Sequence, residues 1–131
     1  FIGTDVNGTA DLGNSLIGVE IIGSSGNTVG GTTAAERNII SGNTQDGVSI
    51  NTGPASNNLV IGNFIGTDVN GTTALGNSFS GVRINGCSNN TVGGTTAGTG
   101  NLLSGNAGDG VAILGAAATG NQVIGNFIGT D

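Results

Sequence analysis

Short apolar residues alternate with polar or small ones along the whole chain, in two recurring phrases. The phrase G-N-x-x-x-G-V-x-I occurs four times, and N-x-V-x-G follows each copy. The Val and Ile of the first phrase lie two residues apart, the spacing of one face of a β-strand. Strands are therefore predicted at residues 18–22, 28–31, 38–41, 47–51, 59–62 and 64–67, and again 63 residues later. The side chains predicted to face inward are Val19, Ile21, Val29, Val48, Ile50, Val60, Val82, Ile84, Val92, Val111, Ile113 and Val123.

The two phrases belong to a longer tandem repeat. The segment FIGTDVNGT at residues 1–9 returns unchanged at 64–72, and FIGTD returns once more at 127–131. Residues 1–63 and 64–126 match without a gap at most positions. Successive G-V pairs are 29, 34 and 29 residues apart, so each repeat holds two similar coils of unequal length. The domain prediction is a single segment over 1–131, made of two repeats and the start of a third.

Three short strands per coil, with the same inward residues in each, predict an all-β fold: a parallel β-solenoid of about four coils. One coil cannot bury its aliphatic side chains alone, but coils stacked at about 4.8 Å close a continuous core. Gly and Asn between the strands are expected to take the positive φ angles that the corners need. Residues 6–17 and their copy at 69–80 are expected to leave the wall as loops, with Leu12 and Leu75 folded back over it.

Composition removes several classes of protein. Glycine fills 28 of 131 positions, yet the strict period of collagen is missing, and good helix formers are too few for long helices. Two arginines against eight acidic residues offer no phosphate-binding surface, so no nucleic-acid partner is expected. No apolar run is long enough to span a bilayer. The single cysteine, Cys87, provides neither a disulfide framework nor a thiolate metal site.

The phrases NTVGGTT, RNIISGN, DGVSI and NFIGTDVNGTTALGN resemble the right-handed parallel β-helix repeats of secreted bacterial proteins in the pectate-lyase-like superfamily. The resemblance covers the whole chain and implies a right-handed solenoid that is extracellular or at the cell surface. The general chirality of parallel crossovers favours the same hand. The superfamily holds lyases, hydrolases, tailspikes, adhesins and plain stalks, so the resemblance implies a fold rather than an activity.

Few residues of this chain are suited to catalysis. A resemblance to polygalacturonases would imply an Asp cluster with His and Lys, and the chain has neither His nor Lys. A resemblance to pectate lyases would imply acidic calcium ligands and a basic residue, for which only Arg37 and Arg83 are present. Asp46 and Asp109 match across the repeat, but two coils separate them by about 9–10 Å, farther than the carboxylates of most glycosidases. We therefore expect no enzyme activity and no catalytic residue.

The two T-D-V-N-G-T segments begin like acidic calcium-binding loops. Asp5, Asn7, Asp68 and Asn70 are weak candidate ligands, because a Thr stands at the third ligand position and the distal Glu is missing. A turn in which Asp caps the backbone and Asn-Gly forms the corner explains the same residues and is favoured. No cofactor is therefore expected, with calcium as the one alternative. Asn7, Asn70 and Asn89 begin N-x-T sequons, which matter only where the source glycosylates asparagine.

A repetitive body without a reaction centre favours a structural role. We expect a non-catalytic segment of an extracellular fibre, stalk or cell-surface adhesin that extends by axial stacking of coils. The partner is then a second copy stacked end to end or the continuation of the same chain, and the extra FIGTD phrase favours a slice of a longer array. The residues expected at this axial contact are Phe1, Ile2, Thr4, Phe127, Ile128 and Thr130. The alternative is a polysaccharide-binding or polysaccharide-processing β-helix whose active residues lie outside this segment.

Overall fold

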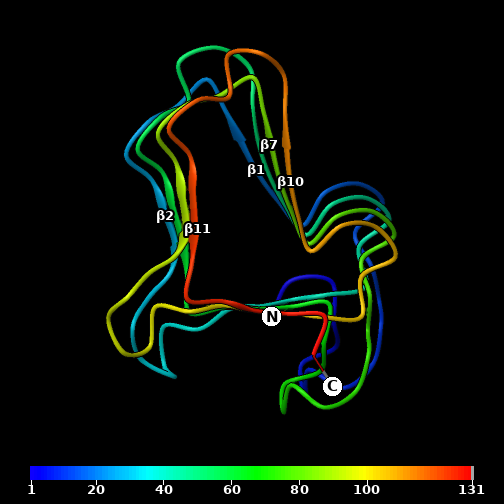
Figure 1. Cartoon of the computed structure of the whole chain (residues 1–131). Helices are drawn as coiled ribbons and strands as arrows, with labels where there is room; N and C mark the ends of the chain where they lie inside the picture. The colour runs from blue at the N-terminus through cyan, green and yellow to red at the C-terminus, as the bar shows by residue number, and fades with distance from the viewer. Residues whose placement is uncertain (131) are drawn as a thin grey trace.

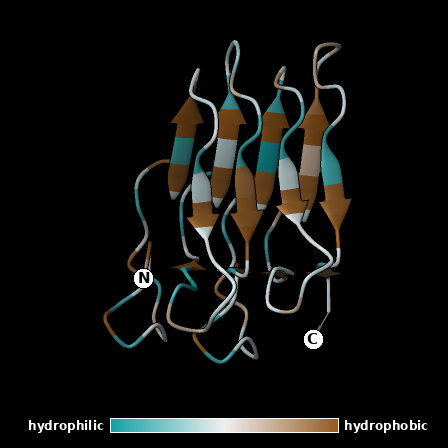
Figure 2. Cartoon of the chain, turned by 90° about the vertical axis from the view of Figure 1, so that its left-hand side faces the viewer, coloured by the Kyte–Doolittle hydropathy of each residue, from teal (hydrophilic) through white to brown (hydrophobic). Residues whose placement is uncertain are grey.

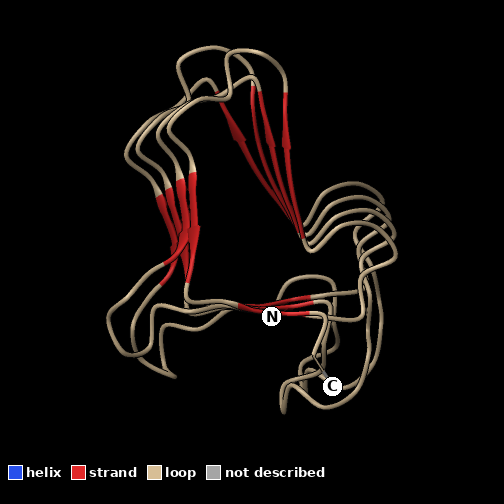
Figure 3. Ribbon diagram, in the orientation of Figure 1, coloured by secondary structure: helices blue, strands red, loops and turns tan. Residues whose placement is uncertain are grey.

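A computed structural model describes residues 1–130, in which all regular structure is β-strand. Twelve short strands form three sheets of four parallel strands each, seen down the solenoid axis in Figures 1 and 3. The first sheet contains β1 (Val19–Ile22), β4 (Val48–Asn51), β7 (Val82–Asn85) and β10 (Val111–Leu114). The second sheet contains β2 (Thr28–Gly30), β5 (Leu59–Ile61), β8 (Thr91–Gly93) and β11 (Gln122–Ile124). The third sheet contains β3 (Ile39–Ile40), β6 (Phe64–Ile65), β9 (Leu102–Leu103) and β12 (Phe127–Ile128).

The predicted parallel β-solenoid is confirmed. Every predicted strand is present, shorter than expected by one or two residues, and equivalent residues pair in register, as in Val48 with Val82 and Ile50 with Ile84. The chain makes about three turns between the first and last strand of each sheet, slightly fewer than the four coils expected. Followed from β1 to β2 and on to the third sheet, the turns wind right-handed (Figures 1 and 2).

The predicted inward positions form the core, except at one end. Val48, Ile50, Val60, Val82, Ile84 and Val92 are fully buried, joined by Ile40, Ile65 and Leu103 from the third sheet. Ile113 and Val123 are in register with the buried Ile84 and Val92 and face the same side as predicted, yet each is 40% exposed. They lie on the end strands β10 and β11, where no further described turn stacks on them. Figure 2 shows the apolar strands of the first two sheets side by side along the axis.

The corners are held by asparagine ladders, which the sequence pattern does not predict. At each corner, four equivalent asparagines stack one above another, and each side-chain amide donates to the Oδ1 of the next Asn at 2.8–3.2 Å. The ladders are Asn14–Asn43–Asn77–Asn106, Asn27–Asn58–Asn90–Asn121 and Asn38–Asn63–Asn101–Asn126. Each Oδ1 that accepts a ladder bond also accepts the backbone N–H of the ladder Asn one turn earlier. These side chains therefore satisfy backbone groups that the corners remove from the sheets.

The expectation that Asn takes positive φ is right only beside the second ladder. Asn57 (φ 56°) and Asn89 (φ 57°) precede ladder residues, and Gly26 and Gly120 take the same place in the other turns. None of the twelve ladder asparagines has positive φ. Apart from Thr52 (φ 55°), the other positive φ angles within residues 1–130 are at glycine, because a Cβ would bring the side chain against the carbonyl oxygen.

The two long loops are shorter than expected. The excursions are hairpin 1 (residues 4–11), closed by a bridge between Thr4 and Asp11, and hairpin 2 (residues 67–74), its repeat equivalent. Residues 77–80 belong to the wall, since Asn77 is a fully buried ladder residue. Leu12 is 72% exposed, so it does not cover the wall as expected, whereas Leu75 is half-buried.

Candidate functional site

An apolar row runs along the outer face of the third sheet. Ile39, Phe64, Leu102 and Phe127 are aligned on successive strands, and Phe1 precedes Ile2, which bridges to Ile40. The period-2 alternation of a strand explains the row, because Ile40, Ile65 and Leu103 point into the core and their neighbours must point outward. Phe1 and Phe127 at the ends of the row are 57% and 66% exposed, while Ile39 is 4% exposed. An outward apolar row of this length needs something to cover its middle.

The hairpins provide this cover. A Cβ at Gly71 would lie 2.8 Å from Leu102 Cδ2 and 3.2 Å from the Phe64 ring, so the hairpin backbone packs directly on these side chains. At Gly8 the corresponding contact is with Phe1 and with Val69 of hairpin 2. Glycine is required at both places by this close approach and by positive φ angles of 68° and 73°.

The two hairpins also bond to each other. The N–H of Val69 donates to the carbonyl oxygen of Gly8 at 2.9 Å. Val69 is half-buried by this contact, whereas its repeat equivalent Val6 is 83% exposed. The hairpins are therefore stacked along the same axis as the sheets.

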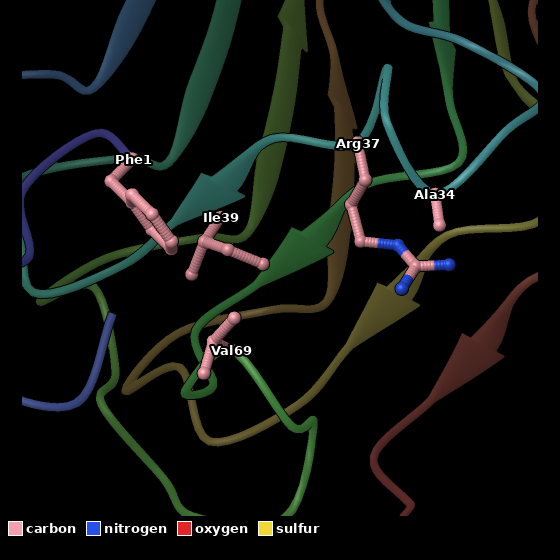
Figure 4. A pocket seen from close by; sticks show the side chains of 5 residues that line it. All are labelled: Phe1, Ala34, Arg37, Ile39 and Val69. Carbon is pink, nitrogen blue, oxygen red and sulfur yellow. The ribbon is translucent and has the colours of Figure 1, made fainter. Parts of the chain in front are cut away.

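A hollow of about 160 Å³ opens beside hairpin 2, lined by Phe1, Ala34, Arg37, Ile39 and Val69. Figure 4 shows the side chain of Arg37 extending past Ala34 at one end of the hollow, with Phe1, Ile39 and Val69 at the other. The Nε–H of Arg37 donates to Gly62 O at 3.3 Å, and its guanidinium lies 4.1 Å from the centre of the Phe64 ring. The five lining residues include no carboxylate, hydroxyl or thiol, so the hollow offers apolar contact and one cation but no group for acid–base or nucleophilic chemistry.

The candidate calcium ligands form the backbone-capping turn. One Asp5 carboxylate oxygen accepts the N–H of Thr9 at 2.7 Å and of Ala10 at 2.9 Å, and the other accepts the Asn7 side-chain amide. Asp68 makes the same three bonds with Thr72, Thr73 and Asn70. The structure thus gives both carboxylates a structural role as turn caps. Calcium binding at Asp5, Asn7, Asp68 and Asn70 stays a prediction, and residues 1–130 bring together no group of three His, Cys, Asp or Glu side chains.

These hydrogen bonds hold both carboxyl groups in their charged form. The bonds from Ala10 and Thr9 lower the pKa of Asp5 from its ordinary value. Burial by itself would raise the pKa of Asp68, but the bonds from Thr72, Thr73 and Asn70 together outweigh it, so its pKa also lies below the ordinary value. Hydrogen bonding to a carboxylate favours ionisation in this way.

The remaining acidic and basic side chains are dispersed. Asp46 is buried, accepts the Ser80 N–H at 3.0 Å, and lies 3.8 Å from the guanidinium of Arg83. Its repeat equivalent Asp109 is exposed. Arg83 lies on the first sheet and Arg37 beside the third, so the only two basic side chains share no site. The Asp46–Arg83 pair was missed because it joins neighbouring turns, which the repeat alignment does not compare.

The residues predicted for axial contact lie at both ends of the third sheet. Ile2 pairs with Ile40 at one end, and β12, containing Phe127 and Ile128, pairs with β9 at the other. Thr4 closes hairpin 1, Thr130 is exposed, and Asp131 lies outside the described residues. The sequon residues Asn7, Asn70 and Asn89 are all exposed.

No family model, curated protein or solved structure matches this chain. The structure supports the parallel β-helical architecture that the resemblance implied, while membership of the pectate-lyase-like superfamily and a secreted bacterial origin stay expectations. Residues 1–130 include no membrane-spanning helix, since none reaches the length and apolar character that a bilayer requires.

Proposed function

We propose that this chain is a non-catalytic structural segment of an extracellular or cell-surface fibre, stalk or adhesin, and that it extends by axial stacking of its repeats. The observation that carries the proposal is the junction between the two repeats inside the chain. There β4 pairs with β7, β5 with β8 and β6 with β9, all parallel and in register. β10 is the repeat equivalent of β4, and β1 is the repeat equivalent of β7. The open edge of β10 therefore corresponds to the edge of β4 that pairs with β7, and the open edge of β1 corresponds to the edge of β7 that pairs with β4.

The backbone supports a second junction of the same kind. Across the internal junction, the amides of Gly47 and Val48 donate to Ser80 O and Gly81 O. Gly110 and Val111 are the repeat equivalents of the two donors, and they lie at the start of β10, the last strand of the first sheet. Unpaired strand edges of this kind are templates for further pairing.

The asparagine ladders support it as well. The amide of Asn43 donates to Asn77 across the internal junction, and the same step is made by Asn58 to Asn90 and by Asn63 to Asn101. At one end, Asn14, Asn27 and Asn38 have Oδ1 atoms that accept no hydrogen bond within residues 1–130. The donors that match them by repeat are Asn106, Asn121 and Asn126 at the other end. A stacked repeat would therefore continue all three ladders without changing a side chain.

One position distinguishes a continuous chain from stacked separate chains. Phe127 and Ile128 occupy, at one end, the place that Phe1 and Ile2 of a stacked copy would need. Two separate chains therefore compete for that place, whereas a continuous chain uses each FIGTD phrase once. The competition disappears in a variant that ends at Asn126.

The experiment is sedimentation velocity on the full chain and on the variant ending at Asn126, over a wide range of concentration. We expect linear oligomers whose population grows with concentration and is larger for the shortened variant. A hydrophobic core cross-section at each end favours the association. Monomers alone for both chains, at the highest concentration that stays soluble, would contradict axial stacking.

A further inference from the structure

We propose that the hairpins form a second axial docking column, in which each hairpin is the binding surface for the hairpin of an adjacent copy of this repeat. This inference rests on the proposed axial stacking and adds a surface outside the three sheets. The column contains the hydrogen bond already present in the chain, from Val69 of hairpin 2 to Gly8 of hairpin 1.

Each hairpin has a donor edge and an acceptor edge. Val6 is the equivalent of the donor Val69, and Gly71 is the equivalent of the acceptor Gly8. Within residues 1–130, the Val6 N–H and the Gly71 carbonyl have no hairpin partner. The burial of the two edges of hairpin 1 differs in the same way. Gly8, at the acceptor edge, is buried beneath hairpin 2, while Val6, at the donor edge, is 83% exposed. The two free edges therefore complement each other.

The spacing of the hairpins identifies the occupant. A hairpin occurs once in every two turns, a rise of about 10 Å, and the internal contact spans this rise. A docking partner must present a carbonyl oxygen at the same rise and the same distance from the third sheet as Gly8 does. Only another hairpin of this repeat, stacked in phase, meets both conditions. Stacking shifted by one turn would place hairpins one or three turns apart and lose the bond, so the column also selects the register.

Proline substitutions at equivalent positions test the donor edge. Val6 and Val69 occupy the second position of turns closed by Gly8 N–H to Asp5 O and by Gly71 N–H to Asp68 O, each 3.0 Å. Proline is accepted at that position but has no N–H to donate. Val69→Pro should make the chain unfold at lower urea concentration, whereas Val6→Pro should leave the midpoint unchanged. Val69→Ala controls for the side chain, because it keeps the N–H. Equal midpoints for the two proline variants would overturn the proposal.

Amide hydrogen exchange by NMR tests docking of a second copy. It is measured against concentration on the full chain and on the variant ending at Asn126. Thr28 and Val111 report pairing at the sheet edges, since their equivalents Thr91 and Val48 donate across turns. We expect the Val6 amide to gain protection together with these two amides. Val6→Pro should weaken association about fivefold, the effect of one lost backbone hydrogen bond.

The outcomes separate this inference from the proposed function. Protection of Thr28 and Val111 without protection of Val6 would overturn the hairpin column and leave axial stacking intact. No protection at any of the three amides, in either chain, would overturn both.

Discussion

Replacing Asn58 by alanine should destabilise the fold far more than the same change one turn away at Asn27. Asn58 is a fully buried interior residue of its ladder, with a neighbour on each side. Its Oδ1 accepts the backbone N–H and the side-chain amide of Asn27, each at 2.9 Å. Its amide donates to Asn90 Oδ1 at 2.9 Å and to Ser24 O at 3.1 Å. Alanine removes all four bonds.

The magnitude follows from these bonds. A hydrogen bond contributes a net value of about 1 kcal/mol, so Asn58→Ala should lower the free energy of unfolding by about 4 kcal/mol. Asn27 is half-buried at the end of the ladder, and its side chain makes only the bonds to Asn58 and Ser24. Asn27→Ala should therefore cost roughly 1–2 kcal/mol.

Urea unfolding followed by far-ultraviolet circular dichroism measures both values, since the chain has no Trp or Tyr for fluorescence. The slope of the free energy against urea concentration should match between the two variants, so the midpoints can be compared directly. Equal losses for Asn58→Ala and Asn27→Ala would refute the claim that interior ladder bonds hold the corners.

Three further changes test other parts of the structure. In urea unfolding, Gly93→Ala should be roughly 3 kcal/mol more destabilising than Gly53→Ala. Both glycines have positive φ, 86° at Gly93 and 67° at Gly53, but a Cβ at Gly93 would clash with Ile124 O while nothing lies within 4 Å of one at Gly53. The pKa of Asp68 is lowered in the folded chain, so its charged form adds stability above the ordinary carboxyl pKa, and this stability is lost as the pH falls through the folded pKa. The thermal midpoint should therefore fall less on acidification in Asp68→Asn, which lacks this carboxyl group, than in the wild type. Burial raises the pKa of the Cys87 thiol, so its reaction with a disulfide reagent at mildly alkaline pH should be slow and should become fast on unfolding in urea; a fast reaction in the folded chain would contradict its burial.

The strands and their stacking could be predicted because they depend on local alternation and on a fixed repeat. Val48 and Ile50 lie two residues apart, and equivalents of both recur in every turn, so their inward direction and their register follow together. Parallel stacking then places identical residues over one another, as with Val48 and Val82. The exposure of Ile113 required a further fact, namely which strand lies at the end of its sheet.

The ladders and the hairpin contact depend on partners in other turns, which local pattern does not identify. Asn43 and Asn77 stand directly after Gly42 and Gly76, so a positive-φ corner explained them equally well from sequence. The sequence nevertheless carries a signal for the ladders. The ladder Asn is present in every turn, whereas the residue before it varies: it is often glycine, but Asn57 stands there before Asn58. The bond between Gly8 and Val69 had no such signal, because the distance between hairpins depends on how each one folds back over the third sheet.

The most direct test of axial extension is to insert a further copy of residues 64–126 after Asn126 and compare the two chains by small-angle X-ray scattering. If each repeat adds two turns to a single axis, the longest dimension should grow by about 10 Å while the cross-sectional radius stays the same. A wider cross-section at unchanged length would show that repeats pack side by side, and would contradict axial extension.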